Sequence, residues 1–390
     1  MKMHMNLHPG FRLPAIVWIL LTLMTIGFLV AMARFALGIG SISNLYNSYP
    51  WGFWISFDLF TGVAISSGAF LMAGMVYILQ IKKFQPLLRP SVLTAFIGYL
   101  MVAIALLVDL GHPERIWYML VYWNHTSVLL EIGICVMSYL TVLAIEFSPV
   151  VFEGVKWNKT AHFIHKFIMP FVIIGVVLST LHQSSLGSLQ LIQPTKLHPL
   201  WWTPMLPVVF FTSAIAIGLA MIILESSLSS HYFKRGLEVD LLEMLAKAIP
   251  YVLGVYLLLK FADLALTGEL NLLFTSGSMS LLFWAEILIG CLIPIVMFSF
   301  KGIRQSPRWM LTGAIILLLG MILNRFNVSW FAVGRLVDFG YVPSLVEMSV
   351  SLAIFSAGIL AFGLAAKHLP VFGHEDHHEL DPVPSPVTGD

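Results

Sequence analysis

The chain has 390 residues, of which 58% are hydrophobic and only 11% are charged, and its mean hydropathy is +0.90. An average soluble domain is about 25% charged, so the composition excludes an ordinary soluble protein, and the net charge of +1 gives no sign of a nucleic-acid-binding surface. The two cysteines, Cys135 and Cys291, lie in apolar stretches and indicate neither a disulfide nor a metal site. An iron–sulfur cluster needs about four cysteine ligands, so the two cysteines of this chain are too few to hold one.

Long apolar segments follow one another along the chain and predict an all-α, polytopic membrane protein. A spanning helix needs roughly 20 mainly apolar residues. The first segment is long enough to stay in the membrane, and it lacks the pattern of a cleaved signal peptide. Prolines mark several edges, at Pro90, Pro204, Pro307 and Pro343. Ten transmembrane helices are expected, at about 14–38, 55–79, 92–110, 127–147, 163–185, 204–225, 241–266, 278–299, 308–327 and 344–366.

Lys and Arg gather in the loops on one side of the membrane, which the positive-inside rule makes the cytoplasmic side. The sequence therefore predicts a ten-helix membrane domain over 14–366, with residues 1–13 and the polar tail 367–390 in the cytoplasm. The fourteen inner residues are Lys2, Arg12, Lys82, Lys83, Arg89, Lys156, Lys159, Lys166, Lys234, Arg235, Lys301, Arg304, Arg308 and Lys367, and the five outer ones are Arg34, Arg115, Lys196, Arg325 and Arg335.

The outer stretches 39–54, 111–126 and 186–203 are long and aromatic rather than charged. Such stretches fit a platform for a partner protein, because they are long for simple connections. They fit equally well the belt of Trp and Tyr that membrane proteins carry at the bilayer surface.

Glu131 lies about one turn inside a predicted span, where an unpaired carboxylate costs at least roughly 2.5 kcal/mol and indicates a functional site by default. We expect its partner to be His182, near the end of the next span. Asp58 and Tyr99, on the two preceding spans, fall in the same outer half of the bilayer, given a rise of about 1.5 Å per residue. Four consecutive spans thus bring Asp, Tyr, Glu and His to one depth.

These side chains suit the binding and protonation of a quinone head. A buried Glu can exchange a proton with a nearby His, and Tyr and His offer hydrogen bonds to a carbonyl oxygen. The competing interpretation is a set of interhelix hydrogen bonds that only fix packing. For Tyr99 alone, a role in packing is the better interpretation. For Glu131 and His182 together, a role in function is the better one.

The second half of the chain carries its own charges within predicted spans. Lys260 and Asp263 lie three residues apart on one helix face, where we expect them to form an ion pair. Glu286 begins a span as Glu131 does, so the two segments are either a weak repeat of four helices plus four or a chance similarity. These charged residues form either a structural network of ion pairs or a polar path for protons or ions. Glu146 and Glu225 are expected at the inner ends of their helices.

No heme is expected. A heme held by two His in a helix bundle needs them at matched depths on facing helices. His182 is alone within a span, whereas His162 and His165 lie at the inner start of the same span.

At these residues the chain resembles the NrfD/PsrC family of quinone-interacting membrane subunits, and within it the HybB-type branch that serves periplasmic [NiFe] hydrogenases. The likeness spans about 49–290, and its most specific blocks are the Pro-Trp-Gly that leads to Asp58 and the His-Gln-Ser-Ser that begins at His182. The segments are 49–58 (YPWGFWISFD), 97–99 (IGY), 127–131 (SVLLE), 182–189 (HQSSLGSL), 198–201 (HPLW) and 283–286 (FWAE).

The resemblance implies two four-helix bundles, at about 55–185 and 204–327, plus additional helices. It implies a menaquinone site near the periplasmic face, to which Asp58, Tyr99, Glu131 and His182 contribute. The implied partners are a ferredoxin-like iron–sulfur subunit and the small and large subunits of a [NiFe] hydrogenase, in the bacterial inner membrane. The chain would then not be catalytic alone, and Glu131 and His182 would handle protons.

Two other functions compete with this one. The first keeps the family but replaces the hydrogenase with a molybdopterin enzyme of the polysulfide-reductase type. The second is a secondary transporter, which would show matched Gly/Pro interruptions in the two halves. No matched pair of such interruptions is evident in the sequence.

Overall fold

The computed structural model describes residues 14–46, 49–333 and 341–372. Within these ranges the chain forms helices and loops but no β-strand, and ten helices are long and apolar enough to cross a membrane. The expected all-α, polytopic architecture is confirmed. The segments 1–13 and 373–390, and with them most of the predicted cytoplasmic ends, lie outside the described residues, as does Arg335.

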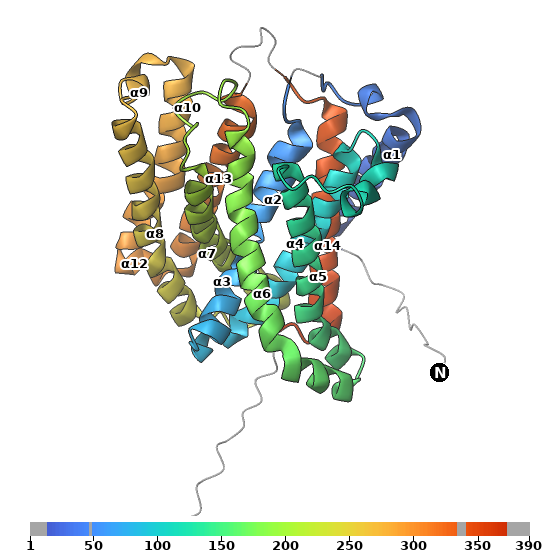
Figure 1. The fold of residues 1–390 in the computed structure, drawn as a ribbon. Coiled ribbons are helices and arrows are strands. Elements are labelled where there is room, and N and C mark those ends of the chain that lie inside the picture. Colours follow the sequence, from blue (N-terminus) through green and yellow to red (C-terminus); the bar gives the residue numbers. More distant parts are fainter. Residues whose placement is uncertain (1–13, 47–48, 334–340, 373–390) are drawn as a thin grey trace, which may run out of the picture.

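The ten helices run side by side along one direction (Figure 1). The second is built from four pieces: η2 (Trp54–Leu59), α2 (Phe60–Ile65), α3 (Gly68–Ala73) and η3 (Gly74–Ile78). The eighth comprises α10 (Ser278–Ile287), η6 (Leu288–Leu292) and α11 (Ile293–Ser299), and the ninth comprises α13 (Pro307–Phe326) and η7 (Asn327–Phe331). The others are α1 (Ala15–Leu37), α4 (Gln85–Asp109), α5 (Val128–Gly154), α6 (Asn158–Leu191), α7 (Leu206–Phe233), α8 (Val239–Leu266) and α14 (Leu345–His368).

Several helices are longer than their apolar segments. Helix α6 has 34 residues and is about 51 Å long at 1.5 Å per residue, well beyond the roughly 30 Å of a bilayer core. Helix α4 begins before Pro90, which lies inside it, so the use of Pro90 as a segment edge was wrong. The proline of the first turn is Pro86, where a missing N–H leaves no intrahelical bond unmade.

Two groups of four helices make up most of the molecule. The first bundle consists of α2–α3, α4, α5 and α6, and the second consists of α7, α8, α10–α11 and α13. Helix α7 packs against α3 and α6 as well as α8 and α13, and so joins the two bundles. Helices α1 and α14 pack against each other, and α14 packs against α4 (Figure 1).

Close backbone approach fixes the second bundle. A Cβ on Gly320 of α13 would overlap the backbone of Gly290 in η6, so these helices touch without intervening side chains, as small residues allow in membrane proteins. Four stretches of the spans, η2, η3, η6 and η7, have the wider π-helical winding, which is frequent at functional sites.

We call the end of the molecule where α4 ends and α5 begins the outer end, marked by Asp109 and Val128, and the opposite end the inner end. The short helix η5 (Pro113–Leu120) connects α4 to α5 at the outer end. Two further short helices, α9 (Leu272–Thr275) and α12 (Lys301–Arg304), lie in the loops that follow α8 and α11.

Candidate functional site

The centre of the first bundle holds a hydrogen-bonded pair of polar side chains. The Tyr99 hydroxyl of α4 lies 3.0 Å from Nδ1 of His182 in α6, and neither residue has any exposed surface. The ring of Tyr139 in α5 packs edge-on against Tyr99, with 4.7 Å between the ring centroids. Three helices of the bundle therefore fix the position of the imidazole.

The second ring nitrogen of His182, Nε2, is buried and has no hydrogen-bond partner within the described chain. Buried polar atoms are normally satisfied, so this atom indicates a place for a ligand or water. If the Tyr99 hydroxyl donates to Nδ1, then Nε2 carries the hydrogen and donates; in the other tautomer Nε2 accepts. The pair can thus hold a carbonyl or hydroxyl oxygen and pass a proton at Nε2.

Glu131 lies in the first turn of α5, which Ser127 caps through a hydrogen bond from the backbone N–H of Leu130 (3.3 Å). A carboxylate is favourable there because the helix N-terminus carries partial positive charge. Its side chain accepts a hydrogen bond from Ser185 of α6. The expected direct bond to His182 is not formed, because His182 points into the bundle while Ser185, three residues later, faces α5.

Glu131 is also more exposed than an acid inside a span was expected to be. It lies at the outer edge of the first bundle, one turn of α6 from His182. Ser185, which bonds to Glu131, lies one helical turn from His182, and the Glu131 carboxylate is accessible from outside the bundle.

Asp58 is buried but faces away from this group. Its carboxylate accepts a hydrogen bond from Ser351 of α14 at 2.5 Å. Nearby, the indole of Trp54 donates to the backbone carbonyl of Glu347 at 3.3 Å. The structure thus places Asp58 between the first bundle and α14, not beside Tyr99 and His182.

At the inner end of the first bundle lies a cavity of about 80 Å³, large enough for water. Glu146 of α5 lines it, together with Tyr77, Arg89 and His165. The prediction that Glu146 lies at a helix end was wrong, because α5 continues for two further turns to Gly154. Glu225 also lies inside a helix and not at its end: it is buried within α7, where it accepts a hydrogen bond from Thr94 at 2.6 Å.

The second bundle holds a buried ion pair that differs from the predicted one. Lys260 pairs with Glu286 of α10 rather than with Asp263, and Asp263 instead accepts a hydrogen bond from Thr203 at 2.6 Å. The spacing on α8 pointed only to Asp263, whereas the fold brings Glu286 of α10 to Lys260. In the sequence, the similarity between the segments that contain Glu131 and Glu286 was the signal that pointed to Glu286.

In the part of the chain that the structure describes, no group of three or more His, Cys, Asp or Glu could hold a metal ion. This finding does not address heme, which two His suffice to hold, so the absence of heme stays a prediction.

A family model described as "Polysulphide reductase, NrfD" matches residues 41–333, three quarters of the chain. The chain belongs to the NrfD family. The matched region begins after α1 and ends before α14, so it contains both bundles, with Tyr99, His182 and the Lys260–Glu286 pair.

Individual NrfD relatives match over almost the whole chain. A protein of Nitratidesulfovibrio vulgaris is 37% identical over 92% of this chain and 94% of its own. The probable Ni/Fe-hydrogenase 2 b-type cytochrome subunit of Escherichia coli is 31% identical over 90% of each chain. The integral membrane subunit of the menaquinone reductase of Nitratidesulfovibrio vulgaris is 29% identical over 90% of this chain and 89% of its own.

Proposed function

We propose that this chain is the quinone-reactive membrane anchor subunit of a respiratory oxidoreductase, and that it passes electrons between a periplasmic iron–sulfur subunit of a [NiFe] hydrogenase and menaquinone. The family and the named relatives support the general role. Both termini are proposed to lie in the cytoplasm, with the outer end in the periplasm of a bacterial inner membrane.

The observation that carries the proposal is the unpartnered Nε2 of His182 beside Tyr99. A quinone head offers carbonyl oxygens, which are the partners that a buried imidazole and phenol can bind. Quinone reduction takes up two electrons and two protons, and the chemistry belongs to the quinone itself. His182 and Tyr99 would position the head, and His182 would hold one proton at Nε2.

Glu131 would serve as the second proton-handling group. Its carboxylate lies at the outer edge of the bundle and is joined to α6 through Ser185. Because Glu131 is exposed while His182 is buried, the two groups differ in access: Glu131 can exchange protons with the outside, and His182 only with its neighbours.

A route for protons from the inner end is supported by the Glu146 cavity. A Cβ on Gly175 of α6 would lie 2.8 Å from the Glu146 carboxylate and 3.6 Å from the ring of Tyr139. Glu146 and Tyr139 therefore face the same glycine, and Tyr139 packs on Tyr99. We propose that protons taken up at the inner end pass from Glu146 along Tyr139 and Tyr99 to His182. Quinone reduction would then build a proton gradient across the membrane.

The test uses the assembled complex. Replacing His182 by Gln, and separately Glu131 by Gln, should lower hydrogen-dependent menaquinone reduction by about 10²-fold or more, the usual contribution of a positioned acid or base. Hydrogen oxidation with a soluble dye, which bypasses the membrane subunit, should stay unchanged and show that the complex is intact. Normal menaquinone reduction in both variants would disprove the assignment.

A further inference from the structure

The Lys260–Glu286 pair lies inside the second bundle and has no role in the function proposed above. Lys260 is 7% exposed and Glu286 is 1% exposed. The carboxylate accepts from the Lys260 ammonium, the Tyr256 hydroxyl (3.3 Å), the Trp201 indole (2.7 Å) and the side-chain amides of Asn324 and Asn327 (2.8 Å each). Charges at this depth are expensive and mark functional sites by default, and packing alone does not require one.

The two bundles carry matched polar positions. Tyr99 of α4 corresponds to Tyr256 of α8, and Glu131 of α5 to Glu286 of α10. His182 and Ser185, three residues apart on α6, correspond to Asn324 and Asn327, three residues apart where α13 passes into η7. Ser185 donates to Glu131 as Asn327 donates to Glu286.

One position breaks this match. Lys260 follows Tyr256 by four residues, and the residue four after Tyr99 is Ala103. The second bundle therefore holds a built-in cation where the first has only a methyl group. Because the ammonium and its partners occupy this space, the second bundle is suited to handle charge rather than to take a quinone head.

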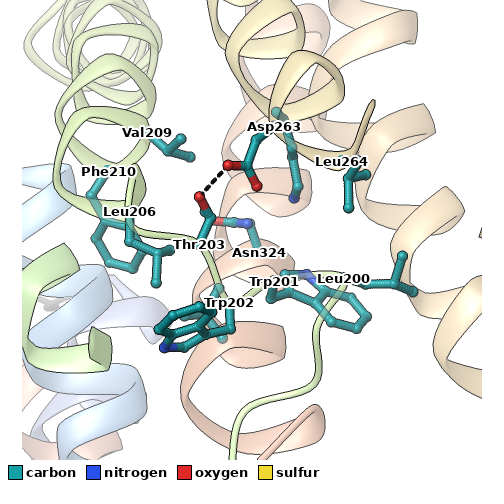
Figure 2. Close-up of a pocket in the computed structure, with 12 residues that line it drawn as sticks. Leu200, Trp201, Trp202, Thr203, Leu206, Val209, Phe210, Asp263, Leu264 and Asn324 are labelled. Carbon is teal, nitrogen blue, oxygen red and sulfur yellow. Dashed lines mark hydrogen bonds between the residues drawn. The ribbon is translucent and has the colours of Figure 1, made fainter. Parts of the chain in front are cut away.

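A second carboxylate lies within reach of Lys260. Lys260 and Asp263, three residues apart on α8, both line a cavity of about 20 Å³, which has room for about one water molecule. Figure 2 shows Asp263 and Asn324 at this cavity, with Thr203 bonded to Asp263 and with Trp201 and Trp202 beside them. Residues at this spacing on a helix have Cβ atoms about 5–6 Å apart, so the long lysine chain can reach either acid.

We propose that Lys260 exchanges its carboxylate partner between Glu286 and Asp263, and that Glu286 binds one proton whenever the ammonium is on Asp263. Lys260 carries this proton, because it lines the cavity and contacts Glu286. The ammonium gives one hydrogen to Glu286 as it leaves, and the amine takes up a proton from the cavity water and is an ammonium again when it pairs with Asp263. Glu286 gains a proton as the ammonium leaves, because an unpaired anion is strongly disfavoured in a site without bulk water. On the way back both transfers are reversed: the ammonium releases a proton to the cavity water, and the neutral amine takes the proton from Glu286 as the pair forms again. The other donors hold the carboxylate in place during the exchange.

The other ionisable groups around Glu286 are Tyr256 on α8, Cys291 in η6 and Arg325 on α13. Arg325 connects the pair to the rest of the molecule: it donates to Asn324 and to Ser213 of α7, at 2.8 Å each. Since α7 also packs on the first bundle, a shift of the pair is transmitted to the helix that both bundles share. A link between this site and electron transfer rests on the proposed function, whereas the protonation of Glu286 does not.

The direct test is infrared spectroscopy of the purified complex as a function of pH. The native protein should show a carboxylic acid carbonyl band that titrates reversibly and is absent in Glu286→Gln. Lys260→Met should show the band already at neutral pH, and Asp263→Asn should lose it, because the ammonium then has no second partner. Native spectra that match those of Glu286→Gln at every pH would overturn the proposal.

The second readout is proton movement by the complex in sealed liposomes. Asp263→Asn should reduce menaquinone within about twofold of the native rate but release fewer protons per electron pair. An unchanged proton ratio in this variant would contradict the role in coupling. A native complex that fails to reduce menaquinone would instead refute the function proposed above, and the infrared result would still decide the Glu286 site.

Discussion

The hydroxyl of Tyr99 lies 3.0 Å from Nδ1 of His182, which leaves Nε2 as the free nitrogen of a fully buried imidazole. The tyrosine therefore selects both the orientation of the ring and the nitrogen that can meet a ligand. This relationship gives the first prediction.

Tyr99→Phe should keep the helix packing but free the imidazole to turn. We expect menaquinone reduction by the assembled complex to fall at least tenfold, with a smaller loss than in His182→Gln because Nε2 is retained. The rate is measured with a water-soluble quinone analogue. Tyr251→Phe, on the exposed face of α8, is the matched control and should be unchanged; equal rates in both variants would exclude a role for the hydrogen bond.

Asp58 should act on stability rather than on turnover. Asp58→Asn and Ser351→Ala each weaken the same hydrogen bond between the first bundle and α14, which contributes about 1 kcal/mol. Both variants should unfold at a lower temperature in detergent, and the double variant should be no worse than the poorer single one. If Asp58→Asn instead abolishes quinone reduction in a stable complex, Asp58 belongs to the quinone site.

Gly320→Ala should destabilise the second bundle, because the added methyl meets the backbone of Gly290. Forced overpacking of this kind costs about 1–3 kcal/mol. Gly254→Ala on α8, where a Cβ meets open space, provides the control and should be neutral or slightly stabilising. The measurement is the fraction of protein that stays monodisperse after heating, which should be lower for Gly320→Ala than for Gly254→Ala.

The orientation can be tested with single cysteines. Asn124→Cys, in the loop between α4 and α5, should react with an impermeant maleimide added outside intact cells, whereas Lys234→Cys, just after α7, should react only in inverted vesicles. The native Cys135 and Cys291 are buried and should stay unlabelled in both preparations. The reverse pattern would place both chain ends in the periplasm.

The purified subunit should show no heme absorption in the visible spectrum, oxidised or reduced. Among the spans, His182 is buried and already bonded to Tyr99, and no second His faces it at that depth within the described residues. The measurement is informative because the Escherichia coli relative is named a b-type cytochrome subunit. A Soret band that persists after gel filtration would contradict the prediction.

Some features of the site were open to sequence analysis, because they depend on local chemistry. The depth of Tyr99 and His182 follows from their positions along apolar runs, and the cost of polar groups in lipid marks them. Glu131 was found for the same reason, although its partner was not. A helix end was misplaced at Pro90, since proline is tolerated inside membrane helices and Pro86 occupies the first turn.

The sequence alone determined that the protein is a bundle of ten membrane-spanning helices, because transfer of about 20 apolar residues into lipid is decided by each segment separately. Only the tertiary structure decided which polar groups meet. Lys260 had two acids within reach and took the one on another helix, and His182 took Tyr99 rather than Glu131. These choices depend on how each helix is rotated against its neighbours, which is set by packing across the bundle and not by spacing along one helix.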